Sequence, residues 1–325
     1  MRPVLKTSMK NLKFIILFIL ALACKQEKIS IPDTGGKIVI NGLLTNDSLI
    51  GVTIGKSVNI NDTDYLEETL LKNAQVYILE NNICLDTLQN IANTFINLGE
   101  DIYIPSNYKS KKLHPLIGHK YEIVVKSTGL PDVNANITIP NLVKIDKIDT
   151  SVITLTGTFD NWQSNIRLLC NIDFTDPAFE NNYYLLYVYR IPNFSSYSNN
   201  IVFSCQDPIV EENLNHGSMM EGVAFSDKSI NAHTFRLKIT LNGKDIGKPF
   251  YDDEGSFNIT HKKTIYFRLY SMSEDYYKYI HTLNLFFKNY NNPLATPAQV
   301  YTNITGGYGI FAGAAVSSDS LVFNY

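Results

Sequence analysis

Short stretches that alternate apolar and polar residues, or that are rich in β-branched residues, recur from Lys37 almost to the end of the chain. Turn residues such as Asn46, Asp47 and Gly118 separate them. This pattern is typical of short strands and limits the chain to a mainly β fold. Tyrosine, phenylalanine and asparagine are frequent, which favours strands and turns over helices. The expected strands lie within residues 37–44, 49–58, 74–80, 119–127, 133–140, 144–159, 166–174, 182–191, 200–205, 232–241 and 263–271.

The spacing of these stretches predicts two domains. Residues 37–140 fit a small immunoglobulin-like β-sandwich of about 100 residues that ends at Pro140. Residues 143–325 form a larger C-terminal β domain with polar loops at 192–200 and 206–222. The second domain is expected to carry one amphipathic helix.

That helix is predicted from residue 271 onward. Ser271 and Glu274 have the spacing of a capping box, and apolar residues then recur every three or four positions. Asn291-Asn292-Pro293 ends the pattern. We expect about four turns, with an apolar stripe packed on the β domain. The stripe comprises Tyr276, Tyr279, Ile280, Leu283 and Phe287.

The N-terminus has the features of an export signal. Residues 1–13 are basic without an acidic residue, and residues 14–23 form an apolar run too short to span a bilayer. The run ends in Ala-Leu-Ala-Cys24, which resembles the lipobox where lipoprotein signal peptides are cut. The sequence therefore predicts a signal peptide over 1–23, lipid on Cys24 and a lipidated tether over 24–36. An ordinary secretory signal is the alternative, and Met9 is a second candidate start.

Charge and cysteine content limit the function further. Without residues 1–23 the chain keeps 24 basic and 31 acidic residues, a formal charge of −7. An acidic exported chain is not expected to bind nucleic acid. Cys84, Cys170 and Cys205 are odd in number, so at most one disulfide can form. Cys170 and Cys205 lie in apolar stretches, which favours buried, unreactive thiols.

No spaced set of catalytic or metal-binding residues is evident. The chain has no H-E-x-x-H, C-x-x-C or G-x-S-x-G motif, and its six histidines are scattered. The segment from Gly307 to Ala312 matches G-x-G-x-x-A, but a strand pattern follows it where a nucleotide site needs a helix. Asp252-Asp253-Glu254 favours a solvated turn over a calcium site. We expect no enzyme activity, no metal and no cofactor; a hydrolase with an unrecognised site is a distant alternative.

Three aromatic residues are candidate binding residues. Trp162 lies at a turn, where it is either a sugar platform or, more commonly, a loop anchor. Tyr301 and Tyr308 flank Gly306-Gly307, and we expect residues 300–304 and 310 onward to form a hairpin whose glycines hold positive φ. Tyrosines of this kind are enriched at interfaces. The favoured alternative is that the hairpin is only a core element.

Several segments resemble one known family. The residues concerned are 38–46, 72–78, 118–126, 174–188, 271–283 and, most specifically, the block PAQVYTNITGGYGIFAGAA at 297–315. Together they resemble a Bacteroidota family of outer-membrane lipoproteins, domain-of-unknown-function family 4249. The resemblance covers nearly all of the chain after Cys24.

The resemblance implies a cellular context more than a chemistry. Such lipoproteins are commonly found beside TonB-dependent outer-membrane transporters, and Lys25-Gln26-Glu27 resembles a signal for export to the cell surface. We therefore expect a non-catalytic outer-membrane lipoprotein that binds a transporter or its cargo. A surface glycan-binding or adhesion lipoprotein is the alternative.

Overall fold

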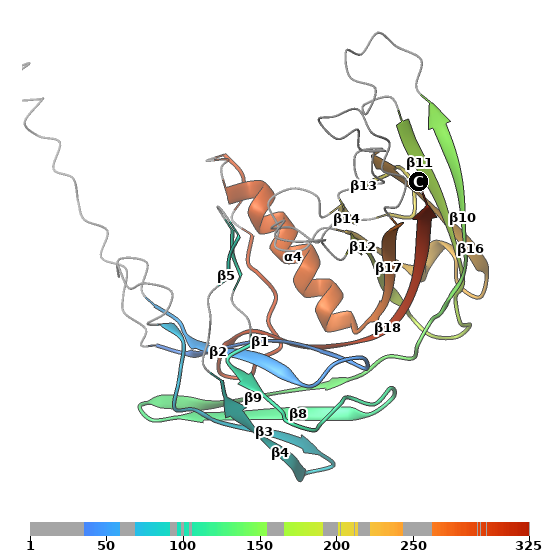
Figure 1. Cartoon of the computed structure of the whole chain (residues 1–325). Helices are drawn as coiled ribbons and strands as arrows, with labels where there is room; N and C mark the ends of the chain where they lie inside the picture. Colours follow the sequence, from blue (N-terminus) through green and yellow to red (C-terminus); the bar gives the residue numbers. More distant parts are fainter. Residues whose placement is uncertain are drawn as a thin grey trace, which may run out of the picture. The chain divides into compact units, whose positions relative to one another are not determined.

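A computed structural model describes most of the chain after residue 35. The described residues are 36–58, 69–91, 96–98, 101–103, 106–154, 166–190, 201, 203–210, 212–213, 222–242, 262–290, 292, 294–296 and 298–324. They belong to one compact unit, Gly36–Tyr325. The predicted fold class is confirmed: the unit is mainly β, with large open sheets arranged like a β-sandwich (Figure 1).

The strands and helices have the following bounds: β1 (Ile38–Thr45), β2 (Gly51–Lys56), β3 (Gln75–Glu80), β4 (Ile83–Asn90), β5 (Ile96–Leu98), β6 (Asp101–Tyr103), β7 (Tyr108–Lys109), β8 (Lys120–Ser127), β9 (Leu130–Thr138), β10 (Ile145–Thr154), β11 (Ile166–Thr175), β12 (Tyr183–Arg190), β13 (Phe203–Cys205), β14 (Glu212–Asn213), β15 (Val223–Ser226), the 3-10 helix η2 (Asp227–Ser229), β16 (Thr234–Asn242), β17 (Lys262–Met272), α4 (Glu274–Tyr290) and β18 (Tyr308–Asn324).

Each predicted strand segment contains a strand, because alternation places every second side chain in the core. In β8, for example, Tyr121, Ile123 and Val125 are buried and the residues between them are more exposed. Side chains of a strand point alternately to its two faces, so this pattern gives the strand one apolar face. Branched and aromatic residues fit such a face well.

A single sheet curls over the first core. The strand order is β14-β15-β12-β17-β18-β1-β2-β7-β4-β3-β8-β9. Its last strand, β9, returns to lie against β18, so closely that a Cβ built on Gly313 would overlap the side chain of Ile137. The enclosed core contains side chains from β1, β2, β3, β8 and β9, together with Phe311 and Ala315 of β18.

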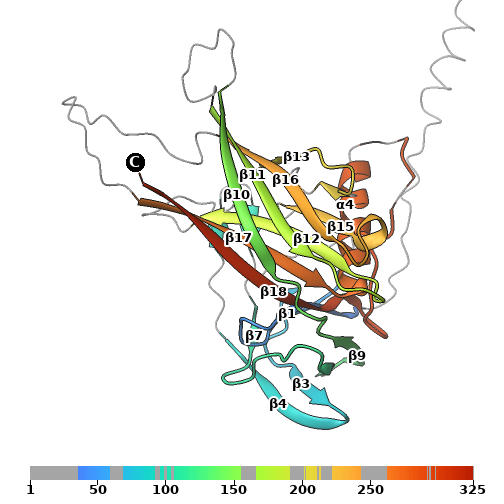
Figure 2. The same ribbon diagram turned by 90° about the vertical axis from the view of Figure 1, so that its right-hand side faces the viewer.

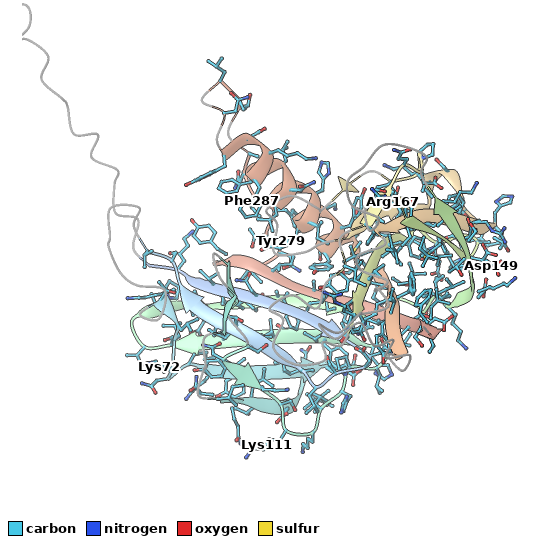
Figure 3. The ribbon with its side chains drawn as sticks, turned by 45° about the horizontal axis from the view of Figure 1, so that its top comes forward. Lys72, Lys111, Asp149, Arg167, Tyr279 and Phe287 are labelled. Carbon is cyan, nitrogen blue, oxygen red and sulfur yellow. The ribbon has the colours of Figure 1, made fainter. Side chains whose placement is uncertain are left out.

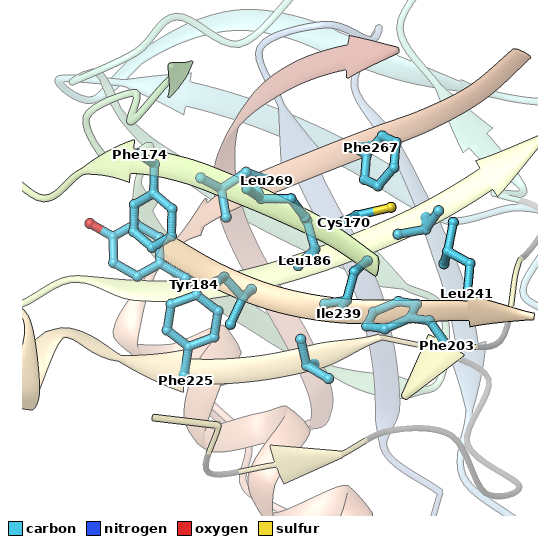
Figure 4. Packing of buried hydrophobic residues seen from close by; sticks show 14 of the residues in the cluster. Cys170, Phe174, Tyr184, Leu186, Phe203, Phe225, Ile239, Leu241, Phe267 and Leu269 are labelled. Carbon is cyan, nitrogen blue, oxygen red and sulfur yellow. The ribbon is translucent and has the colours of Figure 1, made fainter. Parts of the chain in front are cut away.

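The second core lies between this sheet and a four-stranded sheet of order β10-β11-β16-β13. Side chains of β11 and β16 meet those of β12 and β17 there, as Figure 4 shows for Cys170, Leu186, Ile239 and Phe267. Burial raises the pKa of the Cys170 thiol to about 12, so this thiol is unreactive at neutral pH. Cys205 is half-buried, and its thiol contacts the carbonyl oxygen of Lys238 at 3.2 Å.

Strand β18 connects the two cores. Its first part, Tyr308 to Ala314, pairs in parallel with β1, and from Ala314 to Asn324 it pairs antiparallel with β17. The predicted domain division at residues 140–143 lies between β9 and β10. Because the last strand also completes the first core, the two predicted domains share an element; the division itself stays a prediction.

Helix α4 covers the other face of the sheet, opposite the second core. Tyr276 and Ile280 are buried there with Leu185, Met272 and Ala312. The predicted apolar stripe is only partly correct, because its distal member Phe287 is 36% exposed. Figure 3 shows Tyr279 and Phe287 along this helix.

The predicted capping box is wrong by two residues. The helix begins at Glu274, and Ser273 accepts hydrogen bonds from the backbone N–H groups of Tyr276 and Tyr277. Ser271 still belongs to β17, where its buried hydroxyl accepts a hydrogen bond from Val143 N at 3.1 Å. The strand therefore ends immediately before the helix begins.

Candidate functional site

Strands β12 and β17 place a row of tyrosines on the face of the sheet that carries α4. Even-numbered residues of β12 and odd-numbered residues of β17 point into the second core. The alternate residues therefore point to the opposite face. We call this set the tyrosine face: Tyr187, Tyr189, Tyr266, Arg268 and Tyr270, all half-buried.

The register of β12 with β17 brings these side chains together. Tyr189 lies directly opposite Tyr266, and their rings stack with centroids 5.0 Å apart and an interplanar angle of 20°. Tyr187 lies opposite Arg268, and its ring is 6.3 Å from that of Tyr189. Cross-strand aromatic pairs of this geometry stabilise a sheet and fix the orientation of the rings.

Arg268 is the charged member of the tyrosine face. Its Nη2 donates a hydrogen bond to Asp47, and its guanidinium lies 5.1 Å from the centre of the Tyr270 ring. Asp47 is held in turn by Thr45, whose hydroxyl donates to Oδ1 at 2.7 Å. Arg268 Nε is buried and has no hydrogen-bond partner within the described residues. A buried donor of this kind usually meets an acceptor, commonly water or a ligand.

The phenols of Tyr270 and Tyr276 remain neutral at physiological pH. Burial raises the pKa of Tyr270, against the lowering effect of Arg268. Burial also raises the pKa of Tyr276, which contacts this face from α4. Neutral hydroxyls and ring edges can donate hydrogen bonds and pack against a partner, but they supply no acid or base at pH 7. The face is therefore suited to binding.

The predicted C-terminal hairpin is wrong. Residues 300–304 form no strand, and Thr305 makes only an isolated bridge to Asn134. The side chain of Asn303 takes the place of a strand instead. Its Nδ2 donates to Phe311 O at 2.7 Å, and its Oδ1 accepts from Phe311 N at 3.0 Å. Strand β17 pairs with β18 only as far as Ala314, so Asn303 supplies the hydrogen bonds to β18 beyond the end of β17.

Tyr301 and Tyr308 have different surroundings. Tyr301 is half-buried, and its hydroxyl donates to Asp275 Oδ1 at 2.5 Å. Burial and this bond raise the pKa of Tyr301 to about 12. Tyr308 is 45% exposed, and Lys37 Nζ lies 4.9 Å from the centre of its ring. Tyr301 thus fastens its segment to α4, whereas Tyr308 is accessible to a partner.

The glycines of this block have two separate functions. Gly306 and Gly309 have φ values of 81° and 95°, which glycine adopts more readily than other residues; Gly306 lies in a turn and Gly309 in β18. Gly307 does not have a positive φ; it permits close approach, because a Cβ there would lie 2.5 Å from Ile38 O.

Two of the predicted site residues lie outside the described residues: Cys24 and Trp162. Within the described ranges, no three His, Cys, Asp or Glu side chains group closely enough to hold a metal ion. No helix in those ranges combines the length and apolar character needed to cross a membrane. The absence of a metal and of enzyme activity stays a prediction.

Sequence reasoning missed the tyrosine face and the function of Asn303. Tyr187 and Tyr189 stand out as alternate residues of one strand, and Tyr266, Arg268 and Tyr270 as alternate residues of another. That periodicity is a signal for one shared polar-aromatic face. The pairing of the two strands is not readable from it, because more than 70 residues separate β12 from β17 in the chain.

Comparison with known proteins assigns the family. Residues 26–320 match the family described as domain of unknown function (DUF4249). The chain belongs to this family. The expected family, domain-of-unknown-function family 4249, is thereby confirmed; its assignment to Bacteroidota outer-membrane lipoproteins stays a prediction.

Other comparisons add little to the DUF4249 assignment. No curated protein matches the chain. One similar solved structure is described as "Biofilm associated protein - BSP domain", with a TM-score of 0.22 and 10% identity over 89% of this chain and 59% of that one. Another is "Biofilm associated protein - B domain", with a TM-score of 0.21 and 8% identity over 89% of this chain and 86% of that one. This DUF4249 chain thus spans about three fifths of the first structure, and neither likeness supports a function.

Proposed function

We propose that this DUF4249 protein is a non-catalytic lipoprotein of the outer membrane that binds a TonB-dependent transporter or its cargo. The tyrosine face is the observation that carries the binding part of the proposal. Tyrosine and arginine are enriched where proteins bind one another, because both combine a large contact area with hydrogen-bond donors. The anchoring part rests on the apolar run that ends at Cys24.

The contacts of Arg268 favour recognition over a purely structural function. A salt bridge this exposed to solvent contributes little to stability, because water screens the attraction of the charges. Here the pair with Asp47 holds the guanidinium beside Tyr270 and leaves Nε without an acceptor in the described residues. The side chain is thus oriented in advance, which lowers the entropy lost when a partner binds.

A surface glycan-binding or adhesion lipoprotein is the second candidate. The cluster of aromatic rings at Tyr187, Tyr189 and Tyr266 favours it, since aromatic side chains also pack against sugars. The two candidates differ in what a Tyr266→Ala change would abolish: attachment to a protein complex, or retention on a polysaccharide.

The anchor is tested by changing Cys24. Cys24→Ala is expected to abolish incorporation of labelled palmitate and to release the protein from membranes, because the thiol is the only attachment point for the diacylglycerol. Cys84→Ala is the matched control, since Cys84 is an exposed free cysteine. It should keep both labelling and membrane attachment. Membrane attachment of Cys24→Ala at the wild-type level would rule out the lipid anchor.

A further inference from the structure

Among the described residues, the outer half of β18 is an open sheet edge. Strand β1 follows β18 only as far as the pair Thr45–Ala314. Beyond that pair β18 continues to Asn324, hydrogen-bonded to β17 on one side. On its other side no described strand pairs with it beyond Ala314. An unpaired edge presents backbone donors and acceptors to any strand that approaches.

The hydrogen bonds show which residues face this edge. In an antiparallel ladder the N–H and C=O of one residue point the same way. Gly313 O accepts a hydrogen bond from Ser273 N, so the backbone N–H and C=O groups of odd-numbered residues of β18 point toward β17. Val316 N donates instead to the side chain of Asn46, which follows β1. The backbone N–H and C=O groups of even-numbered residues therefore point to the open side. Beyond Val316 these residues are Ser318, Ser320, Val322 and Asn324.

The chain protects this edge only weakly. Ser320 N donates to the side chain of its own neighbour Asp319 at 2.7 Å, a local bond that an incoming strand can replace. Asp319 is the sole charged residue between Ala315 and Asn324, and this stretch has no proline. Natural edge strands are usually blocked by lysine, proline or a bulge. Its sequence thus lacks the usual barriers to strand pairing.

Apolar side chains line the same edge. Leu321 and Phe323 are only partly buried at the margin of the second core, where Ile145 and Ile148 of β10 also lie. On the opposite face, which carries the tyrosine face, Val322 is 46% exposed and pairs with Thr264, two residues before Tyr266. Ser317 Oγ accepts from Ile145 N at 3.0 Å, and beyond that contact β10 separates from β18 (Figure 2). The open margin of β18 therefore presents apolar side chains that are only partly buried.

We propose that the edge of β18 from Ser318 to Asn324 binds a β-strand supplied by another protein. The bound segment is extended, lacks proline and places an apolar side chain at every second residue, against Leu321 and Phe323. Strand addition of this kind takes its affinity from the main chain and its specificity from alternate side chains. The proposal deepens the proposed function, on which it rests, by specifying how the partner is recognised.

The first test asks whether the edge of β18 is unpaired in the free protein. Residue-resolved hydrogen exchange of the full chain is expected to alternate along β18. The amides of Ser318 and Val322 should exchange at least tenfold faster than those of Leu321 and Phe323, which face β17. Equal protection of all four amides would show that the edge is already covered, and would overturn the proposal.

Binding is then tested with a labelled peptide, Lys-Thr-Val-Thr-Val-Thr-Val-Thr-Lys, by fluorescence anisotropy. Two N-methylated forms, one methylated on all three valines and one on all four threonines, each lose the donors of one edge. Exactly one form should bind the full chain at least tenfold more weakly than the parent peptide. Equal weakening of both forms, or of neither, would contradict strand addition.

A pair of variants locates the bound strand. Val322→Pro removes one outward N–H that β17 does not use, and should weaken peptide binding at least tenfold. Val322→Thr keeps both the N–H and the branched side chain, and should bind as the wild type does. A circular dichroism melt of each variant checks that the fold is retained. Unchanged binding to a folded Val322→Pro would overturn the proposal.

Two further outcomes separate the hypotheses. If the chain self-associates in solution and Val322→Pro abolishes this, the edge belongs to a second copy and the proposal is overturned. If the peptide binds as expected but no transporter co-purifies from membranes, strand addition is supported and the proposed function fails. The failures of the two proposals are thus distinguishable.

Discussion

At the residue scale, single amide side chains replace missing strand pairs. Asn303 makes two hydrogen bonds to the backbone of Phe311, and Asn107 does the same for Ile54, with distances of 2.9 and 2.7 Å. Each amide offers one acceptor and two donors, which match the N–H and C=O of one residue. Buried backbone groups are costly when unpaired, so these side chains are needed where a neighbouring strand ends.

Asn303→Ala is expected to destabilise the protein by about 2 to 4 kcal/mol, because it leaves Phe311 N and Phe311 O without partners. Thr302→Ala is the neighbouring control. Within the described part of the chain, Thr302 Oγ1 accepts only from Ile304 N, at 3.2 Å, so its loss should cost about 1 kcal/mol or less. Urea denaturation measures both values. Equal stabilities of the two variants would contradict the proposed function of Asn303.

Asp176 makes stability depend on pH. Its carboxylate accepts hydrogen bonds from the hydroxyl of Tyr184 and from Ala232 N at 3.1 Å. Burial raises the pKa of Asp176, and Asp227 and Glu180 act in the same direction. The folded state therefore binds the proton more tightly than the unfolded state. Stability from this group is present below the ordinary carboxyl pKa of about 4 and is lost as pH rises through the raised value.

Asp176→Asn should remove that dependence. Between pH 4 and the raised pKa, the free energy of unfolding of the wild type is expected to fall, relative to the variant, by up to about 1.4 kcal/mol per pH unit. At pH 4 the variant is less stable than the wild type by about 1 kcal/mol, since an amide cannot accept from both Tyr184 and Ala232. Denaturation curves at several pH values measure the difference. Parallel curves would show that Asp176 does not titrate in this window.

At the element scale, β18 determines how the two cores are joined. Its parallel pairing with β1 requires the backbones to approach closely at Gly309, whose φ is 95°. A Cβ there would overlap the carbonyl oxygen of Ile40. Neither a larger residue nor an ordinary backbone conformation fits this position.

Gly309→Ala is therefore expected to cost about 2 to 5 kcal/mol, from backbone strain and from overpacking against Ile40. Gly118→Ala is the matched control, because Gly118 also has a positive φ of 79° but a Cβ added there would meet no atom within 4 Å. Its cost should be the strain alone, about 1 to 2 kcal/mol. Thermal and urea denaturation compare them. A Gly309→Ala variant as stable as Gly118→Ala would contradict the close approach.

The positions of the strands are predictable from the sequence, but their pairing is not. Local alternation locates the strands, because burial of one face acts on each strand separately. It cannot show that residues 308–314 pair with β1, since no local pattern encodes a partner some 270 residues away. The hairpin predicted at residues 300–311 is wrong for a related reason. The sequence pattern is compatible with a strand, but Asn303 already satisfies the backbone of Phe311.

The candidate site is less predictable than the fold. Tyr301 and Tyr308 belong to one sequence block, and the structure leaves only Tyr308 largely exposed. The tyrosine face depends on the register between β12 and β17, and on Asp47, which is 221 residues from its partner Arg268. Such contacts follow from the assembled sheet, so neither composition nor spacing can identify them.

At the whole-molecule scale, the protein is a β scaffold that presents two adjoining surfaces. The tyrosine face and the open edge of β18 lie on the same sheet, since Ser318 and Ser320 pair directly with Arg268 and Tyr266. A partner strand on that edge would lie next to the tyrosines. The predicted lipid on Cys24 would hold this scaffold at the membrane, where a transporter is available.

The most direct test is the isolation of native complexes from outer membranes that carry a tagged full chain. We predict that a TonB-dependent transporter co-purifies in comparable amount with the wild type. It should be lost at least tenfold from Tyr266→Ala and retained by Tyr77→Ala, a tyrosine of β3 in the first core's sheet. Both variants must show wild-type amounts in the membrane. Absence of any transporter from the wild-type complex, with Tyr266-dependent retention on a polysaccharide, would contradict the proposed function and favour the glycan-binding alternative.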